Sequence, residues 1–173
     1  MNIDMAQKVY SAPEAGLSLT VRLATAADAE ELILLINSAF AIEEFLEGTR
    51  TDAERLAANL QQGTILVAED DARQFVACVY MEARGLRGYL GQLAVAPARQ
   101  GKGLARRLVE AAEERLRQQG CQAVDISVLS LRPELLPLYR RFGFVETGTE
   151  AFAYPRTFKS GEPCHCISMS KPL

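Results

Sequence analysis

The nine residues from Arg99 to Arg107 combine four cations, no anion and two glycines at the start of a helical pattern. Cations are unfavourable at a helix N-terminus, because the helix macrodipole already places about half a positive charge there. Glycines before a helix let backbone N–H groups approach a ligand closely, and such groups bind phosphate. The segment therefore predicts a binding site for a ligand that carries phosphate.

Two common phosphate-binding motifs do not fit these residues. A Walker loop needs Ser or Thr after its Gly-Lys pair, but Lys102 is followed by Gly103. A dinucleotide-binding fingerprint needs a third glycine where the chain has Arg106. The chain does contain the pattern Q/R-x-x-G-x-G/A, which is met by Gln100, Gly103 and Ala105.

This pattern resembles the coenzyme A pyrophosphate loop of the GNAT superfamily of acyl-CoA-dependent N-acetyltransferases, and the chain looks like a small, single-domain, bacterial-type member. The resemblance implies acetyl-CoA as cosubstrate, with its pyrophosphate on backbone N–H groups of the loop and its pantetheine arm paired with the preceding strand. The residues that it assigns to the coenzyme are Leu93, Ala94, Val95, Gln100, Gly101, Lys102, Gly103, Leu104 and Ala105. The side chains of Lys102, Arg106 and Arg107 are candidates for the 3′-phosphate, or belong to an ordinary solvated helix face.

The segment Leu138–Phe144 looks like the second landmark of the same family, F/L-Y-x-x-x-G-F. Acyl transfer from a thioester to an amine needs a neutral amine, a stabilised oxyanion and a proton for the leaving thiolate. The resemblance implies that Tyr139 is the general acid and that a backbone N–H near Val95 holds the oxyanion. The alternative is a core aromatic, because Leu135 and Phe142 flank Tyr139 at helical spacing.

The strand expected before the loop contains no carboxylate that could act as the general base. Some family members place a Glu there, but this chain has Gly91 and Gln92. Glu82 is the candidate base, since it lies two residues from Tyr80 and so shares its face of a strand. The alternative is an exposed carboxylate at a strand end. A second departure is Arg132, where many relatives carry an Asn that touches the cofactor arm.

Acidic residues gather where the family's acceptor pocket would lie. The segment Asp28–Glu54 holds eight carboxylates and one cation, Arg50. Glu43, Glu44 and Glu47 fall between the first two expected helices, in the loop that lines the acceptor pocket of GNAT proteins. We therefore expect Glu43 and Glu44 to bind substrate as part of an anionic lip that attracts a cationic amine. The alternative is ordinary solubilising charge.

The order of the expected elements agrees with the resemblance. Hydrophobic periodicity predicts strands at 17–23, 64–68, 75–81, 89–96, 124–128, 142–147 and 164–169, and helices at 25–40, 51–63, 104–120 and 133–141. Thr25 with Asp28, and Thr51 with Glu54, form capping boxes. Gly85 and Gly88 mark a hairpin, and Pro137 predicts a short or irregular last helix. We expect an α/β (α+β) GNAT fold with a mixed, mostly antiparallel seven-stranded sheet and about four helices, split between the fourth and fifth strands.

The length and composition of the chain indicate how many domains it forms. A length of 173 residues with 49% hydrophobic residues fits one domain, at 17–173, after a flexible arm at 1–16. The chain has neither an apolar run near ~20 residues nor the start of a signal peptide, so we expect a cytoplasmic protein without a membrane partner. No C-x-x-C pair occurs, and Cys164, His165 and Cys166 alternate across a strand, so no metal is expected.

Two functions remain open. The first is an acetyl-CoA-dependent N-acetyltransferase that acts on a small-molecule or peptide amine. The second is a non-catalytic module that binds acyl-CoA as a sensor or scaffold. Nucleic-acid binding through the basic segment 84–107 is disfavoured, because Tyr89 is the only aromatic residue in that segment and the net charge of the chain is −3. The sequence leaves open whether the chain forms a homodimer.

Overall fold

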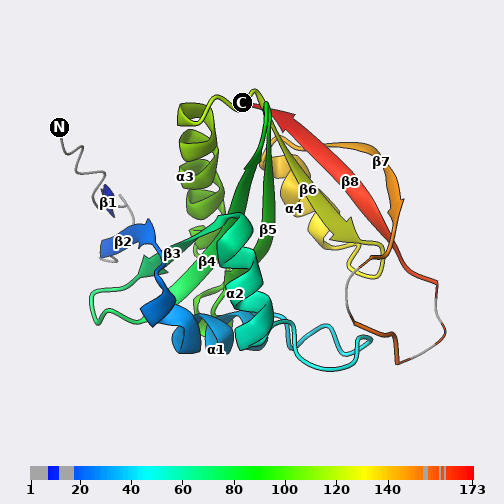
Figure 1. The fold of residues 1–173 in the computed structure, drawn as a ribbon, viewed down its shortest axis with the longest axis horizontal. Helices are drawn as coiled ribbons and strands as arrows, with labels where there is room; N and C mark the ends of the chain where they lie inside the picture. Colours follow the sequence, from blue (N-terminus) through cyan, green and yellow to red (C-terminus); the bar gives the residue numbers. More distant parts are fainter. Residues whose placement is uncertain (1–7, 12–17, 154–155, 160, 162) are drawn as a thin grey trace.

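A mixed sheet with helices on both faces forms the centre of the molecule (Figure 1). The computed structural model describes residues 8–11, 18–153, 156–159, 161 and 163–173. Within them the sheet has eight strands in the order β1-β2-β3-β4-β5-β6-β8-β7. The strands are β1 (Lys8–Ser11), β2 (Ser18–Leu23), β3 (Thr64–Glu69), β4 (Phe75–Arg84), β5 (Arg87–Val95), β6 (Ala123–Leu129), β7 (Val145–Ala151) and β8 (His165–Pro172). The helices are α1 (Ala29–Ala39), α2 (Ala53–Gln62), α3 (Leu104–Gln118) and α4 (Leu135–Arg141), with 3₁₀ turns η1 (Ala26–Asp28) and η2 (Pro97–Arg99).

The predicted fold class is confirmed, with one strand more than expected. β1 lies inside the segment that we predicted as an arm, and it pairs antiparallel with β2 from Lys8 opposite Val21 to Ser11 opposite Ser18. A strand of four residues is at the lower limit of what alternation can reveal. The rest of the predicted arm, residues 1–7 and 12–16, lies outside the described residues.

The predicted split lies between β5 and β6. These two strands are parallel and pair over three positions only, from Arg87 opposite Ala123 to Tyr89 opposite Asp125. Beyond Tyr89, β5 continues to Val95 beside β4, while β6 continues beside β8. Figure 1 shows the two strands meeting near the C-terminus and spreading apart toward the bottom of the view. The sheet therefore opens into a V at the carboxyl ends of both strands.

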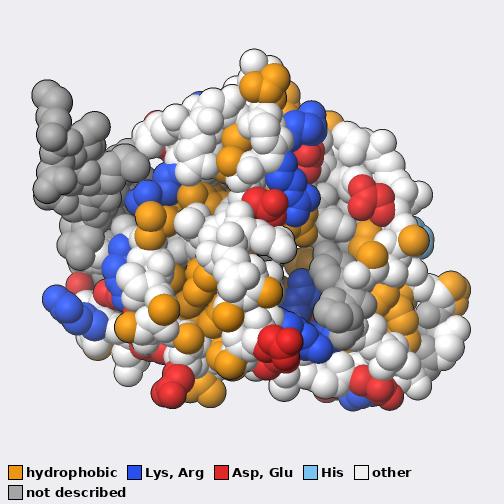
Figure 2. All heavy atoms as spheres, viewed as in Figure 1, with side chains coloured by type: hydrophobic (Ala, Val, Ile, Leu, Met, Phe, Trp, Pro, Cys, Tyr) orange, Lys and Arg blue, Asp and Glu red, His pale blue; other side chains and the backbone are white. Residues whose placement is uncertain are grey.

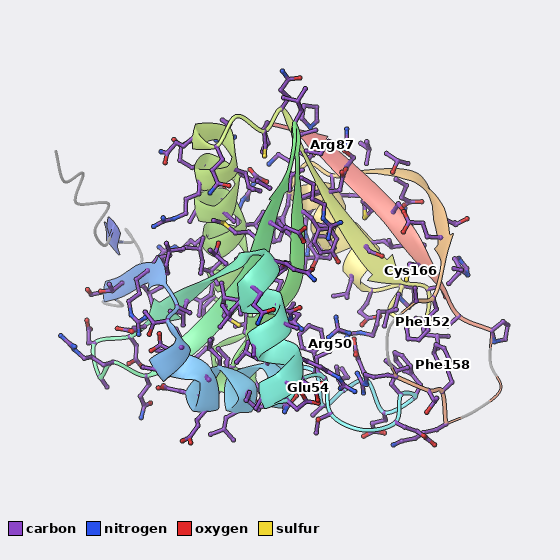
Figure 3. All side chains as sticks on the ribbon, viewed as in Figure 1. Arg50, Glu54, Arg87, Phe152, Phe158 and Cys166 are labelled. Atoms are coloured by element: carbon purple, nitrogen blue, oxygen red, sulfur yellow. The ribbon has the colours of Figure 1, made fainter. Side chains whose placement is uncertain are left out.

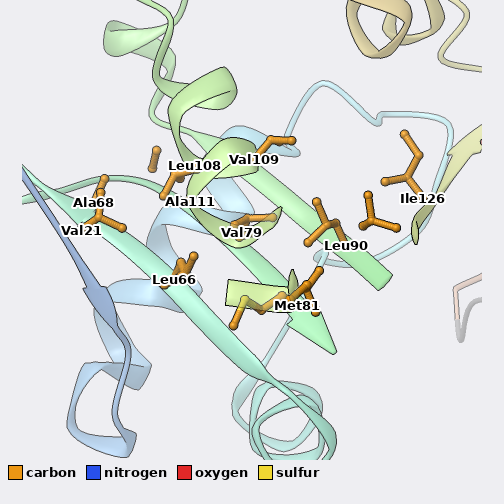
Figure 4. Packing of buried hydrophobic residues seen from close by; sticks show 14 of the residues in the cluster. Val21, Leu66, Ala68, Val79, Met81, Leu90, Leu108, Val109, Ala111 and Ile126 are labelled. Atoms are coloured by element: carbon orange, nitrogen blue, oxygen red, sulfur yellow. The ribbon is translucent and has the colours of Figure 1, made fainter. Parts of the chain in front are cut away.

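Helices cover both faces of the central strands and hold them rigidly. On one face Leu108 of α3 shares a buried cluster with Leu66 and Val79 (Figure 4). On the other face Ile36 of α1 shares a cluster with Ile65. Because successive strand residues point to opposite faces, Ile65 and Leu66 meet different helices. This two-sided burial explains why β3 reads as a continuous apolar run.

Helix starts follow the predicted capping signals at one of two places. The Asp28 carboxylate accepts from the backbone N–H of Thr25 at 2.7 Å, and the 3₁₀ turn η1 then leads into α1. The second prediction is wrong, because Asp52 rather than Thr51 caps α2 by accepting from Arg55 N–H at 2.9 Å. Two capping residue types stand side by side there, so the pattern alone could not choose between them. Thr51 is instead buried, and its N–H donates to Asn37.

Three smaller expectations also change. Gly88 lies inside β5 opposite Ala83 rather than in the hairpin turn, which Gly85 occupies with φ +65°. Pro137 is the third residue of α4, where a helix needs no N–H donor, so it interrupts no hydrogen bond. Phe142 and Phe144 precede the strand β7, which begins and ends later than the strand predicted at 142–147 and runs on to Ala151.

None of the helices in the described part of the chain is long and apolar enough to cross a membrane. α3 has 15 residues, whereas a spanning helix needs about 20.

Gly63 ends α2 where a side chain does not fit, and this generates a prediction. A Cβ at Gly63 would lie 2.5 Å from the backbone oxygen of Met81 and 2.7 Å from the Tyr80 hydroxyl. Gly63→Ala should lower the free energy of unfolding by about 2 kcal/mol, because the backbone of β4 must shift. Urea unfolding followed by circular dichroism measures this. In the control Gly148→Ala, a Cβ meets nothing within 4 Å, and equal losses in both variants would contradict the packing argument.

Candidate functional site

A cleft of about 530 Å³ opens in the V between β5 and β6. Its walls come from β5, β6 and α4, and the loop before α3 closes one end. The end of α1 and the loop after it reach the opposite end through Phe40, Glu43 and Arg50. In Figure 2 a hollow lies near the middle of this face, with basic side chains in blue beneath it. The cleft is therefore long, and its two ends have different linings.

The predicted phosphate loop lies at one end of the cleft. Gly101 and Gly103 both have φ +74°, and Gly103 is the N-cap residue of α3. Left-handed residues at a helix start turn successive N–H groups in one direction, and the first helical turn offers further N–H groups that lack helical acceptors. A Cβ at either glycine would meet nothing within 4 Å, so open space lies beside them. The loop has the geometry of an anion site.

Two side chains fix this loop to the sheet. Gln100 donates from Nε2 to the backbone oxygen of Val95 at 3.3 Å and so ties the loop to the end of β5. Arg99 donates to Asp70 at 2.7 Å. Asp70 in turn accepts from the N–H groups of Ala72 and Gln74 in the β3–β4 turn. The position of the loop is thus set by the end of β5 and by the β3–β4 turn.

The three cations predicted for a terminal phosphate are placed differently from one another. Arg106 lines the cleft, and it also forms an exposed i,i+4 ion pair with Glu110 at 3.2 Å. Lys102 is exposed and Arg107 is half-buried, and neither is among the lining residues. Arg99 and Arg141 line the cleft instead. Of the predicted set, the structure brings Arg106 alone to the cleft wall.

A bulge in β5 changes the direction of its backbone at the cleft. The register with β4 jumps from Cys78 opposite Ala94 to Tyr80 opposite Gly91, which inserts one extra residue in β5. Gln92 has φ +47° within this insertion. After Tyr89 the ladder to β6 has ended, so the edge of β5 that faces the cleft has no strand beside it in the described chain. Such an edge can pair with an extended ligand.

The nine residues assigned to the coenzyme do not all reach the cleft. Leu93 and Val95 line it, whereas Ala94 points to the opposite face and is 1% exposed. Among the loop residues, Gln100, Gly101, Gly103, Leu104 and Ala105 line the cleft. Backbone contacts of Ala94 and Lys102 stay predictions.

Tyr139 lines the cleft and also packs in the core. Its ring makes edge contacts with Phe142 and Phe144, at centroid distances of 6.1 and 5.9 Å. The residue is half-buried at the wall formed by α4. The two interpretations of Tyr139 are thus compatible, because aromatic packing on one side fixes the ring that faces the cleft on the other.

Glu82 lies in a second, smaller cavity of about 340 Å³. This second cavity shares Arg50, Tyr89 and Gln92 with the cleft. Glu82 accepts from Arg84 at 2.8 Å, and this hydrogen bond holds the pKa of the carboxyl below its ordinary value. It also accepts from the Tyr80 hydroxyl at 3.0 Å; burial, together with this contact, raises the pKa of Tyr80 to about 12. The Glu82 carboxylate is therefore held ionised beside the cleft, not in it.

Glu43 lines the cleft but is not exposed as an acidic lip would be. This residue is 4% exposed, and its carboxylate contacts three guanidinium groups. Glu44 is exposed but lines neither cavity, and Glu47 accepts from the Thr157 hydroxyl at 2.6 Å. Local sequence shows a run of acids, whereas folding brings arginines from other segments onto Glu43.

The arginine cluster, defined as Arg50, Arg132 and Arg156 around Glu43, is the part of the site that sequence reasoning missed. The Nη1 atoms lie 3.4, 3.3 and 3.2 Å from the Glu43 oxygens, respectively. Arg50 and Arg132 line the cleft, and Arg50 and Arg156 line the second cavity. Arg50 lies below the spread ends of β5 and β6 (Figure 3). Two separate signals were available in the sequence, Arg50 as the single cation in an acidic segment and Arg132 at a position where many relatives carry an Asn.

The cluster contains three cations and one anion, so its surroundings disfavour the charged form of Arg156. Burial, with repulsion from Arg50 and Arg55, lowers the pKa of Arg156, although Glu43 opposes this. Arg156 also donates to the backbone oxygens of Glu47 and Gly48, both at 3.0 Å, which orient it without neutralising it. Three cations thus share the carboxylate of Glu43 at the end of the cleft opposite the phosphate loop.

None of the four cysteines is among the lining residues of the cleft, and neither is His165. His165 is exposed while Cys166 is buried, so they occupy opposite faces of β8. Within the described residues, no group of three His, Cys, Asp or Glu side chains has the arrangement of a metal site.

Comparisons with known proteins agree with this geometry. Residues 30–144 match the model of the protein family described as Acetyltransferase (GNAT) family. The chain is 31% identical over 153 residues to a protein named probable glucosamine 6-phosphate N-acetyltransferase 2 of Oryza sativa subsp. japonica, covering 82% of this chain and 90% of the relative. It is 29% identical over 130 residues to the streptothricin acetyltransferase of Streptomyces lavendulae, covering 75% of this chain and 64% of that protein.

Solved structures share the fold. The ribosomal-protein-S18-alanine N-acetyltransferase of Escherichia coli has a TM-score of 0.72 over 90% of this chain and 94% of its own, at 18% identity. A nourseothricin acetyltransferase has a TM-score of 0.69 over 89% of this chain and 98% of its own, at 22% identity. At these identities the likeness concerns the fold alone.

The shared carboxylate of Glu43 generates a stability prediction. Glu43→Ala should lower the free energy of unfolding by about 3 kcal/mol, because it removes the carboxylate that three largely buried guanidinium groups share. The neighbouring variant Glu44→Ala should change it by less than about 0.5 kcal/mol, since Glu44 is exposed. Chemical unfolding of both variants at neutral pH makes the comparison. Equal stabilities would mean that the cluster does not depend on Glu43.

Proposed function

Because the chain belongs to the acetyltransferase (GNAT) family, we propose that it transfers an acetyl group from acetyl-CoA directly to a primary amine. The observation that carries the proposal is the cleft between β5 and β6, which joins an anion-binding loop, an unpaired strand edge and Tyr139. These three features meet separate needs of the reaction: holding the donor, orienting it, and supplying a proton.

The donor occupies the loop end of the cleft in this proposal. The pyrophosphate of acetyl-CoA binds the N–H groups at Gln100–Ala105, where the left-handed glycines leave open space. The pantetheine arm lies along the free edge of β5 near Leu93 and Val95 and pairs with its backbone like an added strand. The thioester then reaches the middle of the cleft, next to α4.

The transfer requires one bond to form and one to break. The neutral amine attacks the thioester carbonyl carbon, and a backbone N–H near Val95 stabilises the resulting oxyanion. When the C–S bond breaks, the Tyr139 hydroxyl donates its proton to the thiolate. The packing of Tyr139 against Phe142 and Phe144 supports this role, because it fixes the ring at the cleft wall.

The proton that the amine loses needs an acceptor. Glu82 remains our candidate base, since the second cavity that contains it shares lining residues with the cleft. Its lowered pKa keeps it ionised but makes it a weak base, so water must carry the proton to it. The relatives are named for different acceptors, glucosamine 6-phosphate and streptothricin among them, and we infer from them only a primary amine. A cytoplasmic location stays a prediction of the sequence, which leaves the question of a homodimer open.

The coenzyme loop is tested by Gly103→Glu. A glutamate there places bulk and negative charge in the space proposed for the pyrophosphate, so calorimetry should detect no binding of coenzyme A to the folded variant. Gly103→Ala is the control, because it imposes the same strain at φ +74°, about 1 kcal/mol, without the charge. Unchanged affinity in Gly103→Glu would remove the coenzyme from this loop.

The general acid is tested by Tyr139→Phe. This variant keeps the aromatic packing and loses only the hydroxyl, so turnover should fall by about a hundredfold while the dissociation constant of coenzyme A stays within about twofold. Release of free thiol from acetyl-CoA measures turnover, and calorimetry measures binding. A fully active variant would leave Tyr139 with a structural role alone.

A further inference from the structure

The end of the cleft away from the phosphate loop must receive the amine if the donor binds as proposed. This end is bounded by Phe40, Glu43, Arg50 and Arg132, while the loop residues close the other end. Along its whole length the described lining contains five arginines and one glutamate, Glu43. Arg99, Arg106 and Arg141 belong to the donor end. Arg50 and Arg132 remain at the acceptor end.

These two arginines are held firmly and are largely shielded from water. The side chains of Arg50 and Arg132 are 12% and 13% exposed. The guanidinium of Arg50 lies 4.4 Å from the centre of the Phe40 ring, which adds a cation–π contact. Arg132 also pairs with the exposed carboxylate of Glu134. Their positions are therefore set before any ligand arrives.

The carboxylate of Glu43 is engaged by these arginines rather than offered to a ligand. The Glu43 side chain is 3% exposed, and its carboxylate pairs with Arg50, Arg132 and Arg156 from three separate segments. A cationic group on the acceptor would have to displace a guanidinium from Glu43 and would face the remaining ones. An anionic group meets guanidinium N–H donors instead, whose planar fork matches a phosphate or carboxylate.

We propose that the acceptor amine carries an anionic group, a phosphate or a carboxylate, that binds Arg50 and Arg132 at the acceptor end of the cleft. Glu43 is a positioning residue that holds the two guanidinium groups side by side. Arg156, fixed by the backbone oxygens of Glu47 and Gly48, also pairs with Glu43. This inference rests on the proposed function and replaces the cationic acceptor expected from the acidic segment.

The first test compares acceptors in matched pairs. Amino sugars and ethanolamine are offered with and without a phosphate group, and amino acids are compared with their amides, which lack the carboxylate. Ethylenediamine supplies a second positive charge. The anionic member of the preferred pair should have the higher kcat/KM by about tenfold or more. A best acceptor that is neutral or cationic would overturn the inference and leave the acetyltransferase proposal intact. The phosphate and carboxylate arms identify which anion is recognised.

Variants of Arg50 and Arg132 test whether the arginine cluster causes the preference for an anionic acceptor. Arg50→Gln and Arg132→Gln should each lower kcat/KM for the anionic acceptor by about thirtyfold, mainly through KM, while the neutral member changes by less than about threefold. Arg117→Gln is the matched control, because Arg117 lies near the other end of α3, pairs with Glu114 and lines neither cavity. If either cluster variant lowers both acceptors alike, the cluster does not recognise the anion.

The variant Glu43→Gln tests whether the acceptor site recognises an anionic or a cationic group. Glutamine keeps the size of the side chain and can still accept from guanidinium, but it removes the negative charge. The folded variant should bind an anionic acceptor at least as tightly as the original chain. Loss of activity toward cationic amines, with no gain for anionic ones, would show that Glu43 itself receives the acceptor.

A binding measurement tests the site without catalysis. With coenzyme A saturating the loop, inorganic phosphate should still bind to the original chain and to Arg117→Gln, but not to Arg50→Gln. Phosphate binding that needs Arg50 supports the anion site even if no amine is acetylated, in which case the proposed function fails by itself. Acetate serves as the carboxylate probe in the same measurement. If neither phosphate nor acetate binds, or if binding is unchanged in Arg50→Gln, the inference is overturned.

Discussion

The site depends on one feature of the sheet: β5 and β6 pair over three residues and then separate. A parallel pair that stops leaves backbone groups along the inner edge of β5 without a strand partner in the described chain, and it opens a cleft between two rigid walls. The helices on both faces keep the central strands fixed, so the gap cannot close by bending the sheet. Such an edge can pair with an extended ligand.

Positive charge lies at both ends of this cleft. At the end closed by the loop Gln100–Ala105, the N–H groups of the loop and of the start of α3 provide it through backbone geometry, together with the side chains of Arg99, Arg106 and Arg141. At the opposite end, side chains provide it, because Arg50 and Arg132 share the buried carboxylate of Glu43. A chain with net charge −3 thus presents a cationic lining to its ligands. Net charge is a poor guide to a site, since the local arrangement of charges sets the field within a cleft.

The two interpretations of Tyr139 illustrate how packing supports chemistry. A catalytic hydroxyl has to be held within a fraction of an ångström of its working position. Edge contacts with Phe142 and Phe144 hold the ring, so the features that suggested a core aromatic are the ones that would position a proton donor. The Q-x-x-G-x-A loop is likewise held by Gln100 and Arg99, which tie it to two strand ends.

The sequence by itself determined the features that depend on residues close together along the chain. Period-two and 3.6-residue patterns located seven strands and four helices, and the spacing of Gln100, Gly103 and Tyr139 indicated the family, because each signal lies within one short segment. Only the tertiary structure decided the environment of Glu43. Its partners Arg50, Arg132 and Arg156 lie 7, 89 and 113 residues away along the chain. A local run of acids looks like an exposed lip, but the charge that a ligand meets depends on which distant side chains folding brings onto those carboxylates.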